Sequence, residues 1–292
     1  MKLLYHLLAI ATVCIWGTTF VSTKILLQAG LTPAEIFFLR FLMAYLILRL
    51  YTPKTPQSKP SVKEELQMLG LGITGGSLYF LTENQALQYA PASNVSLLVC
   101  TTPLLTLLLT RLVFRSDRLS LHTLCGSLLA LFGVALVVLD GHFTLHLNPK
   151  GDLLALSASL LWAIYTLLLR SLEERGRFSN LYLTRKVFGY GLLTILPYFL
   201  WQPPHFDLAT LALPTVWGNL LFLGLIASLL CYATWNAVVK HLGTTQSSHY
   251  LYLNPLAASL AAALILGERL TPVALSGAAL ILLGIAWARH KR

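Results

Sequence analysis

One pattern occurs twice in this chain, as SDRLSLHTLCGSLLALFG at Ser116–Gly133 and as GERLTPVALSGAALILLG at Gly267–Gly284. Each copy opens with an acid, an arginine and a leucine, and a hydroxyl residue follows. Each then continues as a leucine-rich segment with two glycines spaced seven positions apart. The copies lie about half a chain length apart, which indicates that the chain is built from two structural repeats.

The composition indicates that most of the chain lies in a lipid bilayer. Apolar residues make up 56% of the 292 residues and charged residues 11%, with a mean hydropathy of +0.71. An ordinary soluble domain carries about 25% charged residues, and one compact core cannot hide this much apolar surface from water. In lipid, a helix needs about 20 apolar residues to cross ~30 Å of hydrocarbon.

Ten apolar blocks approach this length, and none shows the alternation of a membrane β-strand. The predicted spans are Leu3–Leu27, Pro33–Tyr51, Leu66–Gln88, Ala92–Phe114, Leu121–Leu139, Asp152–Ser171, Leu181–Leu200, Trp217–Val239, Thr244–Leu266 and Pro272–Ala288. The predicted fold is therefore an all-α membrane protein with ten transmembrane helices.

The net charge of +10 is unevenly distributed, and its distribution predicts the orientation of the chain. If the N-terminus is cytoplasmic, the inner loops and chain ends hold most of the lysines and arginines, while the outer loops hold Lys150 and Arg269. Cytoplasmic loops of membrane proteins carry such an excess. We therefore expect a multi-pass inner-membrane protein with both termini cytoplasmic, and the charge gives no reason to expect a nucleic-acid partner.

Further residues recur between the two halves of the chain. The pairs are Trp16 with Trp162, Asn84 with Asn236, and Pro103 with Pro255. The predicted repeats are residues 1–141 and 142–292, with five spans each. Because five is odd, the second repeat must enter the membrane from the side opposite to the first. Inverted repeats of this kind build secondary transporters, whose substrate site lies near the bilayer midplane between the repeats.

The residues around these pairs resemble the repeat of EamA-type carriers, which belong to the drug/metabolite transporter superfamily. The resemblance rests on Asn84-Gln-Ala-Leu-Gln-Tyr89, Ala92, Pro103 and the Asp117–Arg118 turn, and on Asn236, Pro255 and Glu268–Arg269 in the second half. It covers essentially the whole chain. It implies ten helices in two inverted five-helix repeats and transport of small metabolites, with amino acids and their derivatives often among them. The first copy carries Ser116 and Asp117 where the second carries Gly267 and Glu268, and this departure affects the expected geometry of the first turn.

Pro103 and Pro255 lie near the middle of their spans, where a proline removes a backbone hydrogen bond and breaks the helix. The carbonyls of Val99 and Leu251, four residues earlier, lose their usual partners. In lipid such groups must be satisfied by protein or by water in a cavity. A packing kink is the alternative, but one such proline in each repeat is typical of helices that bend around a cavity.

Polar and aromatic side chains at helical spacing indicate the walls of this cavity. The predicted substrate-binding residues are Trp16, Asn84, Trp162, Tyr165, Asn236 and Tyr252. Trp16 and Trp162 lie well inside their spans, away from the membrane interface where tryptophan is enriched, so two indoles could stack on a planar substrate. The paired asparagines could supply donors and acceptors to a zwitterion. The alternatives are hydrogen bonding between helices and packing in the core.

Two ionisable residues are candidates for coupling transport to protons. Glu83 is the only acid well inside a predicted span, where a charge is costly. It could titrate during transport, or it could pair with Lys24 or Arg40. His249 could carry a proton, because histidine changes its charge near neutral pH. The alternative for His249 is a structural role in which hydrogen bonds hold the ring.

The remaining features favour a carrier over an enzyme. The sequence contains no P-loop, dinucleotide-binding glycine motif, HExxH or nucleophile elbow, and its four cysteines lack metal-ligand spacing. We expect no metal or cofactor; the expected partners are the lipid bilayer and a small-molecule substrate, with protons as the candidate coupling ion. The predicted function is a secondary transporter that moves a small polar metabolite across the inner membrane by alternating access. Export of an amino acid or an amino-acid derivative is the interpretation that we favour.

Three other functions stay open at this point. The first is an importer of an aromatic vitamin- or nucleobase-like solute, which the paired tryptophans favour. The second is a membrane-embedded lipid enzyme, which would need a charged catalytic cluster at one membrane interface; the sequence supplies none. The third is a non-transporting assembly factor, against which the polar residues inside the spans argue.

Overall fold

The computed structural model describes residues 2–51, 59–90, 92–114, 120–139, 148–266 and 271–289. Its regular elements in these ranges are all helical. The Asp117–Arg118 and Glu268–Arg269 turns and the predicted repeat boundary at residues 141 and 142 lie outside the described residues.

The described helices match the ten predicted spans. They are α1 (Lys2–Gln28), α2 (Pro33–Tyr51), α3–η1–α4 (Val62–Gly72, Ile73–Ser77, Leu78–Tyr89), α5–α6 (Ala92–Val99, Thr102–Val113), α7 (Leu121–Leu139), α8 (Pro149–Glu173), α9 (Asn180–Trp201), α11–η2–α12 (Pro214–Leu221, Phe222–Leu230, Cys231–Leu242), α13–η3–α14 (Thr244–Ser248, His249–Leu253, Asn254–Leu266) and α15 (Pro272–Arg289). A short helix, α10 (Leu208–Leu211), lies between α9 and α11. Among the described residues, five helical segments, one of which is α8, are individually long and apolar enough to cross a membrane.

Two of the spans contain a π-helical segment at corresponding places in the two repeats. Segment η1 interrupts the third span and η2 interrupts the eighth. Within η1, Gly76 has φ −133° and ψ −109°, which is a kink outside the helical region. Short π-helical insertions are frequent at functional sites. The sequence analysis did not predict these segments.

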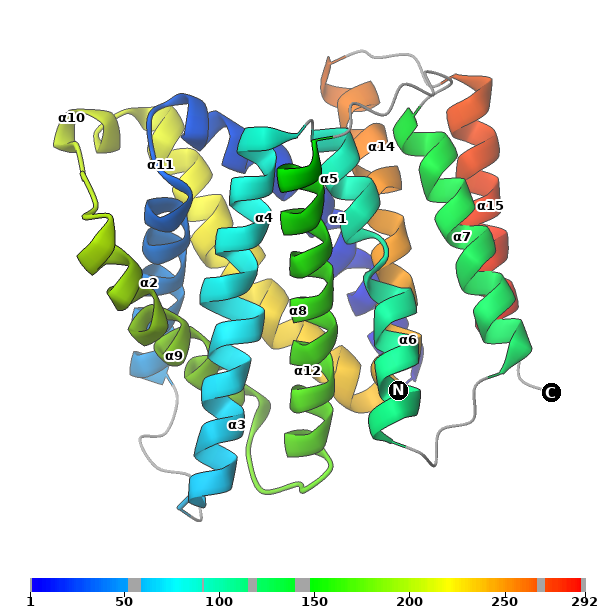
Figure 1. Cartoon of the computed structure of the whole chain (residues 1–292), viewed down its shortest axis with the longest axis horizontal. Helices are drawn as coiled ribbons and strands as arrows, with labels where there is room; N and C mark the ends of the chain where they lie inside the picture. Colours follow the sequence, from blue (N-terminus) through cyan, green and yellow to red (C-terminus); the bar gives the residue numbers. More distant parts are fainter. Residues whose placement is uncertain are drawn as a thin grey trace.

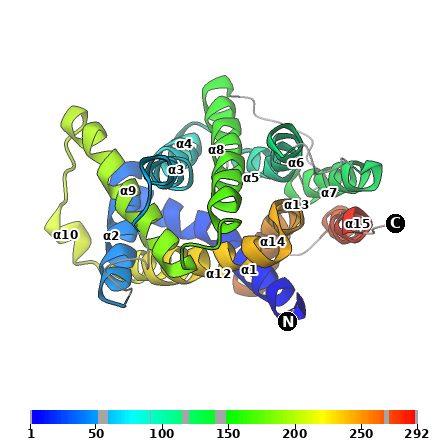
Figure 2. The ribbon, with the colours of Figure 1, turned by 90° about the horizontal axis from the view of Figure 1, so that it is seen from below.

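Helices α7 and α15 contain the repeated pattern, and they pack against each other along one side of the bundle (Figures 1 and 2). A Cβ added to Gly126 would lie 2.6 Å from the carbonyl oxygen of Gly284, and one added to Gly133 would lie 2.6 Å from that of Gly277. The two helix backbones therefore touch, and only glycine fits at these four positions.

The order of these contacts reveals the symmetry of the fold. Gly126 in the first copy corresponds to Gly277 in the second, and Gly133 corresponds to Gly284. Gly126 therefore contacts Gly284, the counterpart of Gly133, and Gly133 contacts Gly277, the counterpart of Gly126. This crossed order means that the two helices run antiparallel. This is the contact pattern of two copies related by a twofold axis. The repeated glycines thus form the packing seam, at which the inverted repeats meet.

Ion pairs join the two repeats at the end of the bundle that holds both chain ends (Figure 1). Glu64, at the start of α3, lies 2.8 Å from Arg177 and 3.3 Å from Arg175, which belong to the connection between α8 and α9. The backbone N–H of Ser61 donates to the Glu64 carboxylate and, with the two arginines, lowers the pKa of Glu64. A second pair joins Glu65 to Lys186 of α9 at 2.8 Å.

Candidate functional site

A cavity with a volume of about 570 Å³, its open mouth included, lies among the helices of both repeats. Its lining consists of Trp16, Thr19, Phe20, Arg40, Tyr79, Phe80, Glu83, Val99, Cys100, Thr102, Trp162, Tyr232, Leu251 and Asn254. Trp16 and Trp162 lie near the middle of α1 and α8, so the cavity is at mid-depth in the bundle. The cavity lies where the sequence predicts a substrate site, between the repeats, and its binding of substrate stays a prediction.

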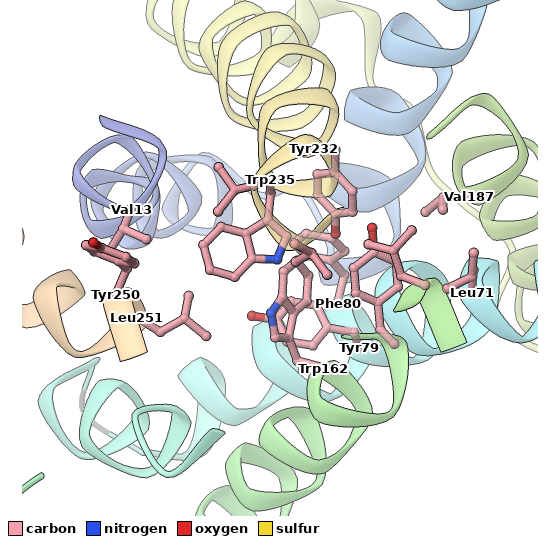
Figure 3. Close-up of a cluster of buried hydrophobic side chains, with 14 of the residues drawn as sticks. Val13, Leu71, Tyr79, Phe80, Trp162, Val187, Tyr232, Trp235, Tyr250 and Leu251 are labelled. Atoms are coloured by element: carbon pink, nitrogen blue, oxygen red, sulfur yellow. The ribbon is translucent and has the colours of Figure 1, made fainter. Parts of the chain in front are cut away.

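Aromatic rings form one wall of the cavity. The rings of Trp16 and Trp162 lie 5.2 Å apart at an angle of 89°, and Tyr232 lies 5.7 Å from Trp162. Figure 3 shows Trp162 of α8 close to Tyr79 and Phe80 of α4 and to Tyr232 of α12. An edge-to-face pair of indoles is a rigid apolar surface, against which an apolar or aromatic part of a ligand can pack.

The π-helical segments are held by side chains of this wall. Trp16 Nε1 donates to the carbonyl oxygen of Ala227 in η2 at 2.9 Å, and the Tyr232 hydroxyl donates to that of Gly75 in η1 at 2.5 Å. Gly75 and Ala227 occupy corresponding positions in the two repeats. Trp162 Nε1, unlike Trp16 Nε1, has no hydrogen-bond partner among the described residues.

The α-helices of the two spans that contain Pro103 and Pro255 are both interrupted beside the cavity. Helix α5 ends at Val99 and α6 begins at Thr102, while the 3₁₀ segment η3 precedes α14. The freed carbonyl oxygen of Val99 accepts from Thr102 Oγ1 at 2.7 Å and from Ser159 Oγ at 3.1 Å. The carbonyl oxygen of Leu251 accepts a weak bond from Cys100 Sγ at 3.9 Å. Val99 and Leu251 also line the cavity, so both breaks shape its wall.

Two charged residues face the cavity. The Tyr79 hydroxyl donates to Glu83 Oε1 at 2.6 Å. Arg40 Nε donates to Ser228 Oγ at 2.8 Å, and its guanidinium lies 4.4 Å from the centre of the Phe80 ring. Of the two bases considered as partners of Glu83, Arg40 shares the cavity with it; Lys24 is exposed.

The predicted asparagines and two predicted tyrosines lie outside the cavity lining. Asn236 is fully buried, its Oδ1 accepts from the Tyr165 hydroxyl at 2.5 Å, and its Nδ2 donates to Thr184 Oγ1 at 3.0 Å. Asn84 Nδ2 donates to the carbonyl oxygen of Pro33 at 3.4 Å. In this structure Asn84, Asn236 and Tyr165 bond between helices, and the contact of these three residues and of Tyr252 with substrate stays a prediction.

His249 is also buried outside the lining. Its Nε2 lies 2.9 Å from Ser127 Oγ, and its ring stacks 6.4 Å from Tyr252. Ser127 lies on α7 of the first repeat, so this bond links the two repeats. The role of His249 in coupling stays a prediction.

Sequence reasoning missed Arg40, Tyr79, Tyr232 and Asn254 as cavity residues. The strongest available signal was Arg40, because a base inside a span is a functional candidate by default. Asn254 and Thr102 each directly precede the proline of their repeat, so the proline pair itself could have indicated both. Within the part of the chain that the structure describes, no three His, Cys, Asp or Glu side chains form a group that could hold a metal.

Comparison with known proteins decides the family. A sequence model of the EamA-like transporter family matches residues 3–139 and again residues 149–289. The chain belongs to the EamA-like transporter family. The two matches confirm a chain of two EamA repeats, and the helical structure agrees with the ten-helix architecture.

Relatives of this EamA chain extend over nearly its whole length. An uncharacterized transporter of Archaeoglobus fulgidus is 29% identical, over 90% of each chain. A probable amino-acid metabolite efflux pump of Salmonella typhimurium is 28% identical, over 95% of this chain and 92% of the relative. A probable terminal-alkyne amino-acid exporter of Streptantibioticus cattleyicolor is 27% identical, over 94% and 90%. One solved crystal structure shares the fold, with a TM-score of 0.76 at 19% identity over 99% of this chain and 98% of the other.

Proposed function

We propose that this EamA protein is a secondary transporter that exports an amino acid or an amino-acid derivative across the inner membrane. The observation that carries the proposal is the cavity at mid-depth, because residues of both inverted repeats line it. Rocking of one repeat against the other would expose such a site to each side of the membrane in turn. The relatives named as amino-acid efflux pumps and exporters support the substrate class.

A second candidate is import of an aromatic vitamin- or nucleobase-like solute. The perpendicular pair of Trp16 and Trp162 favours this candidate, since a planar ring could pack against one indole and meet the edge of the other. Proton coupling is part of either proposal. Glu83 is the residue we propose to load and release the proton, because it faces the cavity and Tyr79 holds it in place.

Ligand binding and transport by the purified protein distinguish between these two substrate classes. We expect at least one amino acid to raise the melting temperature in a screen of amino acids, nucleobases and vitamins, because a ligand that binds the folded state stabilises it by mass action. The same solute should then be transported by proteoliposomes, faster with an imposed proton gradient. Stabilisation by vitamins or nucleobases alone would favour the second candidate, and transport of none of the solutes would contradict a carrier function.

The orientation is a separate expectation. Helix α1 begins and α15 ends on one side of the bundle, and we propose that this side is cytoplasmic because the connection between α8 and α9, with Arg175 and Arg177, lies there. A fluorescent reporter that folds only in the cytoplasm should be active when fused after Arg292, while a phosphatase that needs the periplasm should be inactive there. The reverse pattern would show that the protein is inserted the other way round.

A further inference from the structure

The guanidinium of Arg40 is held rigidly at the wall of the cavity. Arg40 is 3% exposed, its Nε is bonded to Ser228 in η2, and its Cζ lies 4.4 Å from the centre of the Phe80 ring. The hydrogen bond to Ser228 uses one of its three nitrogens. No hydrogen bond joins its two Nη groups to any residue that the structure describes, and the residue lines the cavity. A fork of N–H donors therefore remains available for a ligand.

This charge lacks an ion-pair partner within the described protein. The ion pairs found in the described ranges involve Glu64, Glu65, Glu173 and Glu174, all near the end of the bundle that holds the chain ends. Glu83 lies in the same cavity and attracts Arg40, but no direct ion pair joins the two within the described residues. A buried arginine at mid-depth in a membrane protein is costly unless it is paired directly. An anionic group of a ligand in contact with the guanidinium would lower this cost, and a carboxylate fits its planar fork in a bidentate manner.

The same cavity contains groups suited to the opposite charge. Glu83 has Oε1 bonded to Tyr79, and no hydrogen bond from a described residue uses its Oε2. Asn254 Oδ1 is buried in the lining without a partner among the described residues. Both are acceptors for the three N–H donors of an ammonium group.

We propose that Arg40 binds the carboxylate and Glu83 the ammonium group of a zwitterionic amino acid, whose side chain packs against Trp16 and Trp162. This assignment rests on the proposed transport function and names the recognition chemistry of its site. It requires both charged groups on one substrate. It also explains why a membrane cavity holds an arginine and a glutamate that form no direct ion pair within the described chain.

Substrate analogues test the assignment one charge at a time. The probes are L-phenylalanine and L-leucine, their decarboxylated amines 2-phenylethylamine and 3-methylbutylamine, and their deaminated acids 3-phenylpropanoate and 4-methylpentanoate. Binding is measured on the purified full-length carrier by thermal shift and titration calorimetry, and transport is measured in proteoliposomes. For the wild type, each amino acid should bind more tightly than either analogue, by on the order of ten- to a hundredfold, because each analogue leaves one buried charge unpaired.

Two variants should lose this preference selectively. Arg40→Gln should weaken amino-acid binding by on the order of ten- to a hundredfold and leave binding of the amines unchanged or tighter. Glu83→Gln should weaken amino-acid binding similarly and spare the acids. Retained binding of the amines by Arg40→Gln, and of the acids by Glu83→Gln, shows that each variant is folded. Lys150→Gln and Glu174→Gln are matched controls on exposed residues, and both should behave like the wild type.

The outcomes separate this assignment from the transport function. If the wild type transports an amino acid and Arg40→Gln loses amine and amino-acid binding equally, the carboxylate assignment is wrong while the carrier function stands. If the wild type transports a vitamin or nucleobase and neither amino acid, the zwitterion assignment is also wrong. If the wild type transports no solute at all, the proposed function itself fails.

Discussion

Gly133→Leu should leave little folded protein, because it places a large side chain where two helix backbones touch. A Cβ alone would lie 2.6 Å from the Gly277 carbonyl oxygen and 2.8 Å from the backbone nitrogen of Ile281, and neither backbone atom can rotate away. Overpacking in a core typically costs about 1–3 kcal/mol, and here the whole of α7 would have to separate from α15. The yield of monodisperse protein in fluorescence-detected size exclusion and the ligand-free melting temperature measure the loss.

A matched control is available in the same chain. Gly218 in α11 is exposed, and a Cβ added there meets no atom within 4 Å. Gly218→Leu should therefore melt at or slightly above the wild-type temperature, since leucine is a better helix former than glycine by up to about 1 kcal/mol. Equal losses in Gly133→Leu and Gly218→Leu would contradict the packing seam.

The symmetry of the packing seam gives a second, independent check. Gly126 and Gly284 contact each other, so Gly126→Ala and Gly284→Ala each push the same two backbones apart. Once one methyl group has separated the helices, the second should cost less, and the double variant should be clearly less destabilised than the sum of the two. Additive losses would mean that the two glycines act at separate contacts.

The sequence was sufficient for the fold because the lipid environment leaves few choices. A segment of about 20 apolar residues in lipid must form a helix to satisfy its backbone, so the span boundaries follow from hydropathy alone. The glycines of the repeated pattern predicted a repeat, and the structure adds their physical role, which is contact between the two copies. The helix changes beside Pro103 and Pro255 were also predictable, since proline deletes a backbone hydrogen bond wherever it occurs in a span.

The candidate site was less predictable than the fold. A residue that occurs at matching positions in both repeats can point into the cavity or toward another helix, and the sequence does not tell which. Asn84 and Asn236 recur as clearly as Trp16 and Trp162, yet the asparagines bond between helices and the tryptophans line the cavity. Arg40 was considered from the sequence only as an ion-pair partner of Glu83, and the structure was needed to show that its guanidinium lines the cavity. The π-helical segments η1 and η2 were not predicted, because hydropathy and proline positions do not distinguish a π-helical segment from an α-helix.

Replacing Pro103 and Pro255 together by alanine should impair transport severely while the protein still folds. Each alanine supplies a backbone N–H that can reach the carbonyl four residues earlier, on Val99 or Leu251, and continue the helix. The carbonyl of Val99 would then exchange its bonds from Thr102 and Ser159 for a bond within the helix. Because Val99 and Leu251 line the cavity, straightening both helices changes the shape of the wall. We expect transport to fall by at least about tenfold, which corresponds to about 1.4 kcal/mol in the barrier.

Pro197 supplies the control for this double variant. It also lies inside a helix, α9, but its side chain is exposed and lies outside the cavity lining. Pro197→Ala should therefore transport like the wild type, and the two single variants at Pro103 and Pro255 should show intermediate rates. Uptake into proteoliposomes at matched protein content measures all four variants, with the ligand-free melting temperature as the test of folding. Wild-type transport by the double variant would show that the breaks at the two prolines are packing features, because a cavity of altered shape cannot bind and release the same substrate at the same rate.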